Sequence, residues 1–172
     1  AALILTEAWI AYVQFQLERI PSLIERAESL LDNRTAESLL LGELNFFRAK
    51  LLYWQGEAEI SVRYFEEALS QVSHKDTHVR SNILLMLGLA RHMLGQKEDA
   101  IRELTLWIRA TDSSEEYLLG YLIAGLTFVH LLSGDLIEAK VQGQRLQTVT
   151  RKISYSNSYA WSLYLKACAH LH

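Results

Sequence analysis

The sequence predicts an all-α protein, a right-handed superhelical stack of antiparallel helical hairpins with a period of 39 residues. The chain has 172 residues, half of them hydrophobic and 22% charged, with Pro21 as its single proline. Such long proline-free stretches, rich in good helix formers, favour helices throughout. Glycines then follow long apolar runs at Gly56, Gly95 and Gly134, with spacings of 95 − 56 = 39 and 134 − 95 = 39. Equal periods of this length are typical of helical-hairpin arrays.

Each repeat glycine is expected to end one helix and to precede the next. Five residues past the three glycines stand Ser61, Ala100 and Ala139, which are small enough to let the second helix of a hairpin pack closely on the first. The linking segments between hairpins are rich in turn formers, and Asp76 is one of the residues that we expect to cap the following helix.

This spacing divides the chain into antiparallel pairs and a last helix. One period before Gly56 lies Leu17, so the first pair lacks its glycine, although Pro21 suits a helix start. The expected helices span residues 3–17 with 20–32, 36–55 with 57–73, 77–94 with 96–111, 114–133 with 135–152, and a ninth from about 156 onward.

Composition excludes several classes of partner. The formal net charge is −3 and the basic residues are scattered, so we expect no direct contact with nucleic acid. Cys168 is the lone cysteine, which favours a reducing compartment and hence the cytoplasm. Between Glu116 and Asp135 no charged residue occurs, a run at the lower limit of a membrane span. Because this run falls where the repeat places a hairpin helix, we interpret it as a buried helix and expect no membrane contact.

The residue patterns that carry catalysis are weak in this sequence. His74 and His78 are four apart but straddle a turn and lack a partner in register, so we predict no metal site. The paired acids Glu66-Glu67 are adjacent and point about 100° apart on a helix, which does not allow them to flank one substrate bond. We found neither a Gly-x-Ser-x-Gly elbow nor a phosphate-binding loop. The sequence therefore predicts a non-enzymatic protein without a cofactor.

A family resemblance covers nearly the whole chain. The segments Leu41–Glu57 and Asn82–Gly95, the leading Ala8-Trp9 helix and the Glu25–Glu28 helix are similar to the tetratricopeptide-like sensor region of the large ATP-dependent LuxR-type transcriptional activators, of the maltose-regulon activator type. The resemblance implies that residues 1–172 form a single tetratricopeptide-like domain cut from a longer protein. It also implies a nucleotide-binding domain before this region and a helix-turn-helix after it.

Candidate binding residues come from superimposing the repeats. The first helix of each hairpin is expected to line the concave wall of the stack, and the wall positions lie thirteen, ten, six and three residues before each repeat glycine. The wall mixes aromatic rings with a few polar groups, as small-molecule sites do. The alternative is that the aromatic members simply pack the hairpins. The predicted binding wall comprises Glu43, Phe46, Lys50, Tyr53, Asn82, His92, Tyr121 and Phe128.

Two functions remain open at this point. The resemblance implies an inducer-sensing region that releases an autoinhibited activator for self-association when a small molecule binds the wall. The alternative is a scaffold on which the same wall holds a peptide or another domain of the parent chain. Arg48 occupies a position where the other hairpins have Leu87 and Leu126, so we expect it either to snorkel or to pair with a nearby glutamate.

Overall fold

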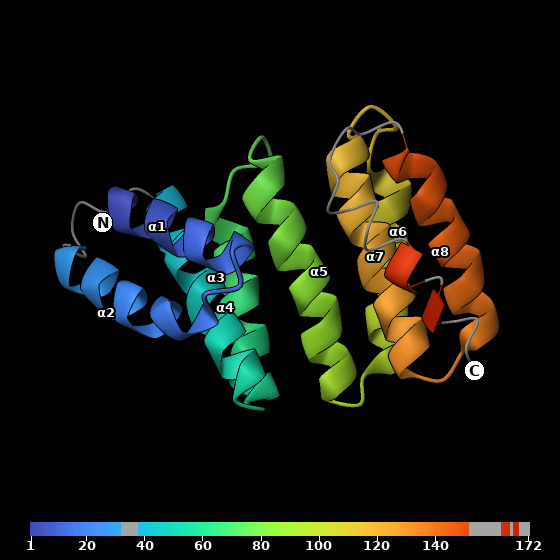
Figure 1. Ribbon diagram of the computed structural model, residues 1–172, viewed down its shortest axis with the longest axis horizontal. Coiled ribbons are helices and arrows are strands. Elements are labelled where there is room, and N and C mark those ends of the chain that lie inside the picture. Colours follow the sequence, from blue (N-terminus) through green and yellow to red (C-terminus); the bar gives the residue numbers. More distant parts are fainter. Residues whose placement is uncertain (32–37, 152–162, 166, 169–172) are drawn as a thin grey trace. The chain divides into compact units, whose positions relative to one another are not determined.

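The computed structural model describes residues 1–31, 38–151, 163–165 and 167–168. Within these residues the secondary structure is helical and there is no β-strand, which confirms the all-α prediction. The elements run in pairs along the chain (Figure 1). They are α1 (Ala2–Val13), the 3₁₀ helix η1 (Leu17–Arg19), α2 (Ile20–Leu30), α3 (Ser38–Trp54), α4 (Ala58–Gln71), α5 (Thr77–Met93), α6 (Lys97–Ala110), α7 (Glu116–Leu132) and α8 (Leu136–Thr150).

Seven of the eight predicted helices before residue 152 agree with these bounds to within two residues at each end. The exception is the first, predicted for residues 3–17, which ends at Val13. The predicted ninth helix lies mostly outside the described residues, although 163–165 and 167–168 are helical. The right-handed superhelix stays a prediction.

The helices form two compact units, Ala1–His74 and Lys75–His172. In the first unit α3 packs against α4 and is also contacted by α1 and α2. Its core contains an aromatic cluster, in which Trp9 stacks on Phe46 with ring centroids 5.0 Å apart and meets Phe47 edge-on at 4.9 Å. Phe46, Phe47 and Phe65 are fully buried. Such ring pairs stabilise the hairpin contact beyond simple area burial.

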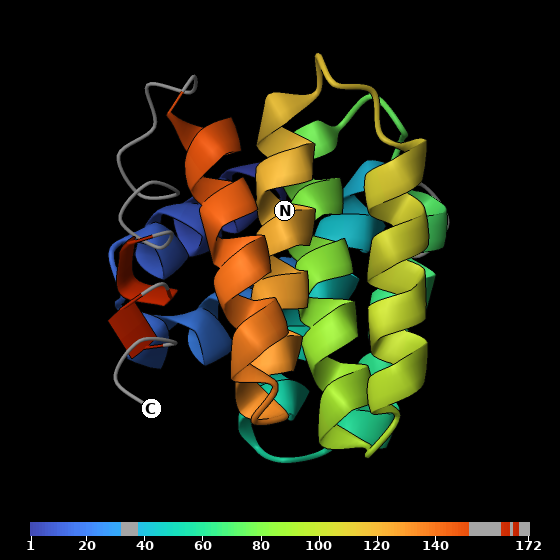
Figure 2. The same cartoon turned by 90° about the vertical axis from the view of Figure 1, so that its right-hand side faces the viewer.

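In the second unit α7 packs against α5, α6 and α8, and Figure 2 shows these four helices side by side. Its core is aliphatic, with Ile83, Leu104, Leu122 and Leu146 almost completely removed from solvent. The uncharged run between Glu116 and Asp135 is thus a packed hairpin helix, as expected. No helix in the described part of the chain combines the length and the apolar character needed to cross a membrane.

The four hairpins share one turn. Gly56, Gly95 and Gly134 have φ of 86°, 77° and 73°. The amide after each of them donates to the carbonyl five residues earlier, as in Glu57 N–H to Leu52 O at 2.9 Å, which is the Schellman pattern that ends helices.

The first hairpin has the same turn without a glycine. Phe15 takes the left-handed conformation there, with φ of 58°, and the Gln16 amide donates to Ala11 O at 2.9 Å. The counterpart of the repeat glycines is therefore Phe15 and not Leu17. The wrong assignment followed from extending the 39-residue period, whereas the first hairpin is 56 − 15 = 41 residues from the second.

Candidate functional site

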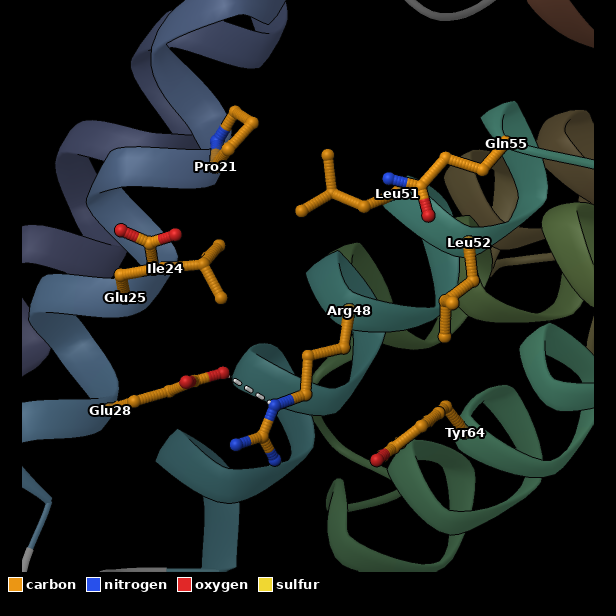
Figure 3. A pocket seen from close by; sticks show the side chains of 9 residues that line it. All are labelled: Pro21, Ile24, Glu25, Glu28, Arg48, Leu51, Leu52, Gln55 and Tyr64. Carbon is orange, nitrogen blue, oxygen red and sulfur yellow. Dashed lines mark hydrogen bonds and ion pairs between the residues drawn. The ribbon is translucent and has the colours of Figure 1, made fainter. Parts of the chain in front are cut away.

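A cleft of about 350 Å³ opens in the first unit between α2 and the α3–α4 hairpin. Figure 3 shows α2 on one side and α3 with α4 on the other, with side chains from both reaching toward the space between them. The volume is at the lower end of the range for small-molecule pockets. The lining residues are Pro21, Ile24, Glu25, Glu28, Arg48, Leu51, Leu52, Gln55 and Tyr64.

Helical periodicity explains why these residues meet. The α2 contribution follows the spacing i, i+3, i+4 and i+7 from Pro21 to Glu28, and the α3 contribution repeats it from Arg48 to Gln55. Residues at these spacings lie along one face of a helix. Pro21 stands in the first turn of α2, where a missing amide hydrogen breaks no helical bond. Two stripes of the same register thus face each other.

Arg48 is the fixed polar centre of the cleft. Its Nε donates to Glu28 Oε1 at 2.6 Å and its Nη1 donates to Asn45 Oδ1 at 3.1 Å. The guanidinium carbon also lies 5.9 Å from the centroid of the Tyr64 ring, within the range of a cation–π contact. The predicted ion pair with a nearby glutamate is confirmed. Because both side chains of the pair are about one-third exposed, the pair positions the guanidinium more than it stabilises the fold.

The remaining lining divides into an apolar floor and a polar rim. The apolar floor consists of Ile24 of α2 and of Leu51 and Leu52 of α3, and Figure 3 shows the side chains of Ile24 and Leu51 pointing toward each other. At the rim lie the exposed carboxylate of Glu25 and the exposed amide of Gln55. Apolar surface for contact with a few polar groups for orientation is the composition of a ligand site.

The ionisable side chains that line the cleft are Glu25, Glu28, Arg48 and Tyr64, and the lining contains no histidine, cysteine or serine. Within the described residues there is also no group of three or more histidine, cysteine, aspartate or glutamate side chains placed to hold a metal ion. His78 instead lies 2.9 Å from the Tyr117 hydroxyl through its Nδ1.

The predicted binding wall is, in the first unit, the side of α3 that packs against α1. Glu43 Oε2 accepts a hydrogen bond from Trp9 Nε1 at 3.1 Å. Phe46 is fully buried beneath the Trp9 ring, and Tyr53 is half-buried, which raises the pKa of its phenol. These wall positions contribute to the packing between the first two hairpins.

Lys50 is the most unusual wall residue. Only 3% of its surface is exposed, and its Nζ has no hydrogen-bond partner among the described residues. The Nζ lies 3.3 Å from the centroid of the Tyr12 ring, with the Phe46 and Trp54 rings at 5.4 and 5.5 Å. Burial lowers the pKa of the amine well below its ordinary value of 10.5, because removal from water disfavours the charged form.

In the second unit the wall residues contact other residues of the same unit. Asn82 is buried and donates from Nδ2 to the His78 carbonyl at 2.9 Å. His92 Nε2 lies 3.0 Å from Ser133 Oγ, and the Tyr121 ring is 4.8 Å from that of Tyr117. Phe128 is partly exposed on α7. Ligand binding along a wall that combines both units stays a prediction.

Sequence reasoning missed most of the cleft. Arg48 was singled out, but Glu25, Glu28, Gln55 and Tyr64 were not proposed as site residues. The sequence does carry a signal for the cleft: Arg48 stands where the equivalent residues of other hairpins are leucines, and it begins a stripe at helical spacing that ends at Gln55. The matching stripe on α2 is present in the sequence as well, but its position opposite α3 depends on tertiary packing, which the spacing alone does not reveal.

Comparison with models of known protein families and with curated proteins found no match for this chain. The resemblance to a LuxR-type sensor region therefore carries over only as a proposal.

Proposed function

We propose that this chain is the signal-sensing region of a bacterial LuxR-type transcriptional activator, acting in the cytoplasm by binding a small molecule and not by catalysis. The all-helical hairpin architecture is compatible with such a region. The residue patterns of Leu41–Glu57 and Asn82–Gly95 support the family. On this proposal, binding shifts the activator from an autoinhibited to a self-associating state, because the ligand binds one state more tightly than the other.

The observation that carries the proposal is the cleft of the first unit. It joins a floor of Ile24, Leu51 and Leu52 to the guanidinium of Arg48, which Glu28 and Asn45 hold in place. A cleft whose polar centre is already ordered requires little further ordering of side chains when a ligand binds, which favours affinity. We therefore place the primary small-molecule site in this cleft, and we keep the predicted wall as a second surface.

A ligand screen with a blocked cleft tests this proposal. A library of soluble metabolites is screened by thermal shift against the whole chain and against Gln55→Trp, which fills the rim of the cleft with an indole. Glu59→Trp serves as the control, because Glu59 is exposed on α4 and does not line the cleft. We expect compounds that raise the melting temperature of the native chain and of Glu59→Trp but not that of Gln55→Trp.

Two results would contradict the proposal. The first is a screen in which no compound stabilises the native chain. The second is a set of stabilising compounds that act equally on Gln55→Trp, which would place their site outside the cleft.

A specific observation favours the alternative, a scaffold for a peptide or for another domain of the parent chain. Leu132, Ile137 and Val141 of α7 and α8 are 58, 79 and 49% exposed. Ile137 and Val141 are four residues apart on α8 and therefore share one face of that helix, and exposed apolar side chains on one face are typical of protein interaction surfaces. Replacing Ile137 by Lys should then abolish capture of the partner domain while leaving small-molecule binding in the cleft unchanged.

A further inference from the structure

The charges around the cleft select among ligand classes. Glu25 and Glu28 supply two carboxylates, and Arg48 supplies one guanidinium. The guanidinium is engaged by Glu28, Asn45 and Tyr64, whereas Glu25 makes no hydrogen bond or ion pair with the described residues. The cleft therefore keeps one net negative charge, and the carboxylate that carries it stands at the rim.

The apolar floor of the cleft indicates that part of the ligand is apolar. The apolar lining consists of Ile24, Leu51 and Leu52, whose side chains offer methyl groups and no polar atoms to an occupant. The positive charge of Arg48 is already paired with Glu28, whose Oε1 lies 2.6 Å from the Arg48 Nε, so an incoming anion would add a further negative charge beside this ion pair and beside Glu25. An incoming cation meets an unengaged carboxylate instead, and opposite charges at close range favour binding.

We infer that the cleft binds a small organic monocation, a primary amine or guanidine joined to an apolar body. This inference rests on the proposed small-molecule function and names its ligand class. The apolar body lies on the floor formed by Ile24, Leu51 and Leu52, and the cationic group pairs with Glu25 at the rim. A volume of about 350 Å³ suits a small molecule of this kind rather than a folded partner.

Three probes of the same length and different charge test the inference. Hexylamine, hexan-1-ol and hexanoate are titrated into the isotopically labelled full chain, and amide chemical shifts of residues 22–28 and 48–55 give the dissociation constants. For ligands this small we expect constants in the millimolar range. Hexylamine should bind about two- to fivefold more tightly than hexan-1-ol, as for a partly exposed ion pair, and hexanoate should bind most weakly.

Matched variants assign the preference to one carboxylate. Glu25→Gln should remove most of the advantage of hexylamine and leave hexan-1-ol unchanged, whereas Glu59→Gln, the same charge change outside the cleft, should leave all three unchanged. Glu25→Lys should reverse the order of hexylamine and hexanoate. Raising the salt from about 50 mM to about 500 mM should shrink the advantage of hexylamine in the native chain, because screening weakens exposed charge pairs.

The inference is overturned if hexanoate binds as tightly as hexylamine, if Glu59→Gln weakens hexylamine as much as Glu25→Gln does, or if none of the probes shifts the cleft amides. These failures differ from a failure of the proposed function. A cleft that binds hexan-1-ol without preferring hexylamine would leave a small-molecule site whose ligand is not a cation. Library compounds lost only in Gln55→Trp would support the small-molecule site even if all three probes failed.

Discussion

Lys50 places an amine among aromatic rings, where two physical effects oppose each other. Burial lowers the pKa of the amine, while the Tyr12 ring at 3.3 Å favours the ammonium form. We expect burial to dominate, because no oxygen among the described residues accepts a hydrogen bond from the Nζ. Replacing Lys50 by Met should then raise the free energy of unfolding at pH 7 on the order of 1–3 kcal/mol. Urea unfolding measures it, with the exposed Lys140→Met as the control.

The lowered pKa of Lys50 also predicts that the free energy of unfolding depends on pH. The pKa of Lys50 is lower in the folded chain than its ordinary value of 10.5. At pH values between the lowered folded-state pKa and 10.5, the amine is therefore protonated more in the unfolded chain than in the folded chain. Stability should therefore rise with pH across that window, and the advantage of Lys50→Met should shrink from pH 7 to about pH 10. Unfolding curves of both proteins at several pH values test the sign. A Lys50→Met protein that is less stable at every pH would show that the ring contacts dominate instead.

Phe15 is a second residue whose backbone is unfavourable for its type. It has a φ of 58° and its side chain is 78% exposed, so little packing compensates the left-handed conformation. Phe15→Gly should raise the free energy of unfolding by about 1 kcal/mol, and Gly56→Ala, at the equivalent turn, should lower it by about the same amount. Thermal unfolding of the two variants checks the opposite signs. Equal signs would contradict the shared turn.

At the scale of elements, two helical glycines report how closely the helices approach. A Cβ on Gly42 of α3 would lie 2.5 Å from Val72 Cγ2 and 3.3 Å from the Ala68 carbonyl, whereas one on Gly120 of α7 would meet its nearest atom at 3.8 Å. Gly120→Ala should stabilise by up to about 1 kcal/mol through helix propensity. Gly42→Ala should destabilise by about 1–2 kcal/mol, because the clash with the α3–α4 contact exceeds that gain. Chemical unfolding distinguishes the two, and stabilisation by both would mean that α3 and α4 separate easily.

The helices themselves were predictable because each depends on local chemistry. The repeat glycines and Asp76, which accepts a bond from the Val79 amide at 3.2 Å, mark ends that the chain encodes within a few residues. The turn at Phe15 was missed because its conformation is imposed by the hairpin and not by its residue type. The cleft was missed for a related reason, since the separation of α2 from α3 is a tertiary distance. Counting on the repeat found Lys50 without revealing that Tyr12 of α1 covers it.

At the scale of the whole chain, each compact unit has its own core, which contains an aromatic cluster in Ala1–His74 and is aliphatic in Lys75–His172. In helical arrays each repeat is stabilised mainly by contacts with the adjacent repeats, so a destabilising substitution in one unit should loosen mainly that unit. Phe65→Leu should lower the free energy of unfolding on the order of 1 kcal/mol and should speed amide hydrogen exchange in α1–α4 more than in α5–α8. Ile83→Val should instead speed exchange more in α5–α8. Exchange followed by mass spectrometry measures this. Equal acceleration across both units would indicate one cooperative unit.

The open turn at Gly56 is a suitable position for a label that reports ligand binding in the cleft. A Cβ built there would meet no atom within 4 Å, and the neighbouring residue in the chain is Gln55 at the rim of the cleft. An environment-sensitive fluorophore attached through a cysteine in place of Gly56 would meet no neighbouring side chain, although any side chain there disfavours the left-handed turn conformation, with φ of 86°, that suits glycine. Its emission would change when the cleft fills, which would turn the domain into an optical biosensor for its own signal.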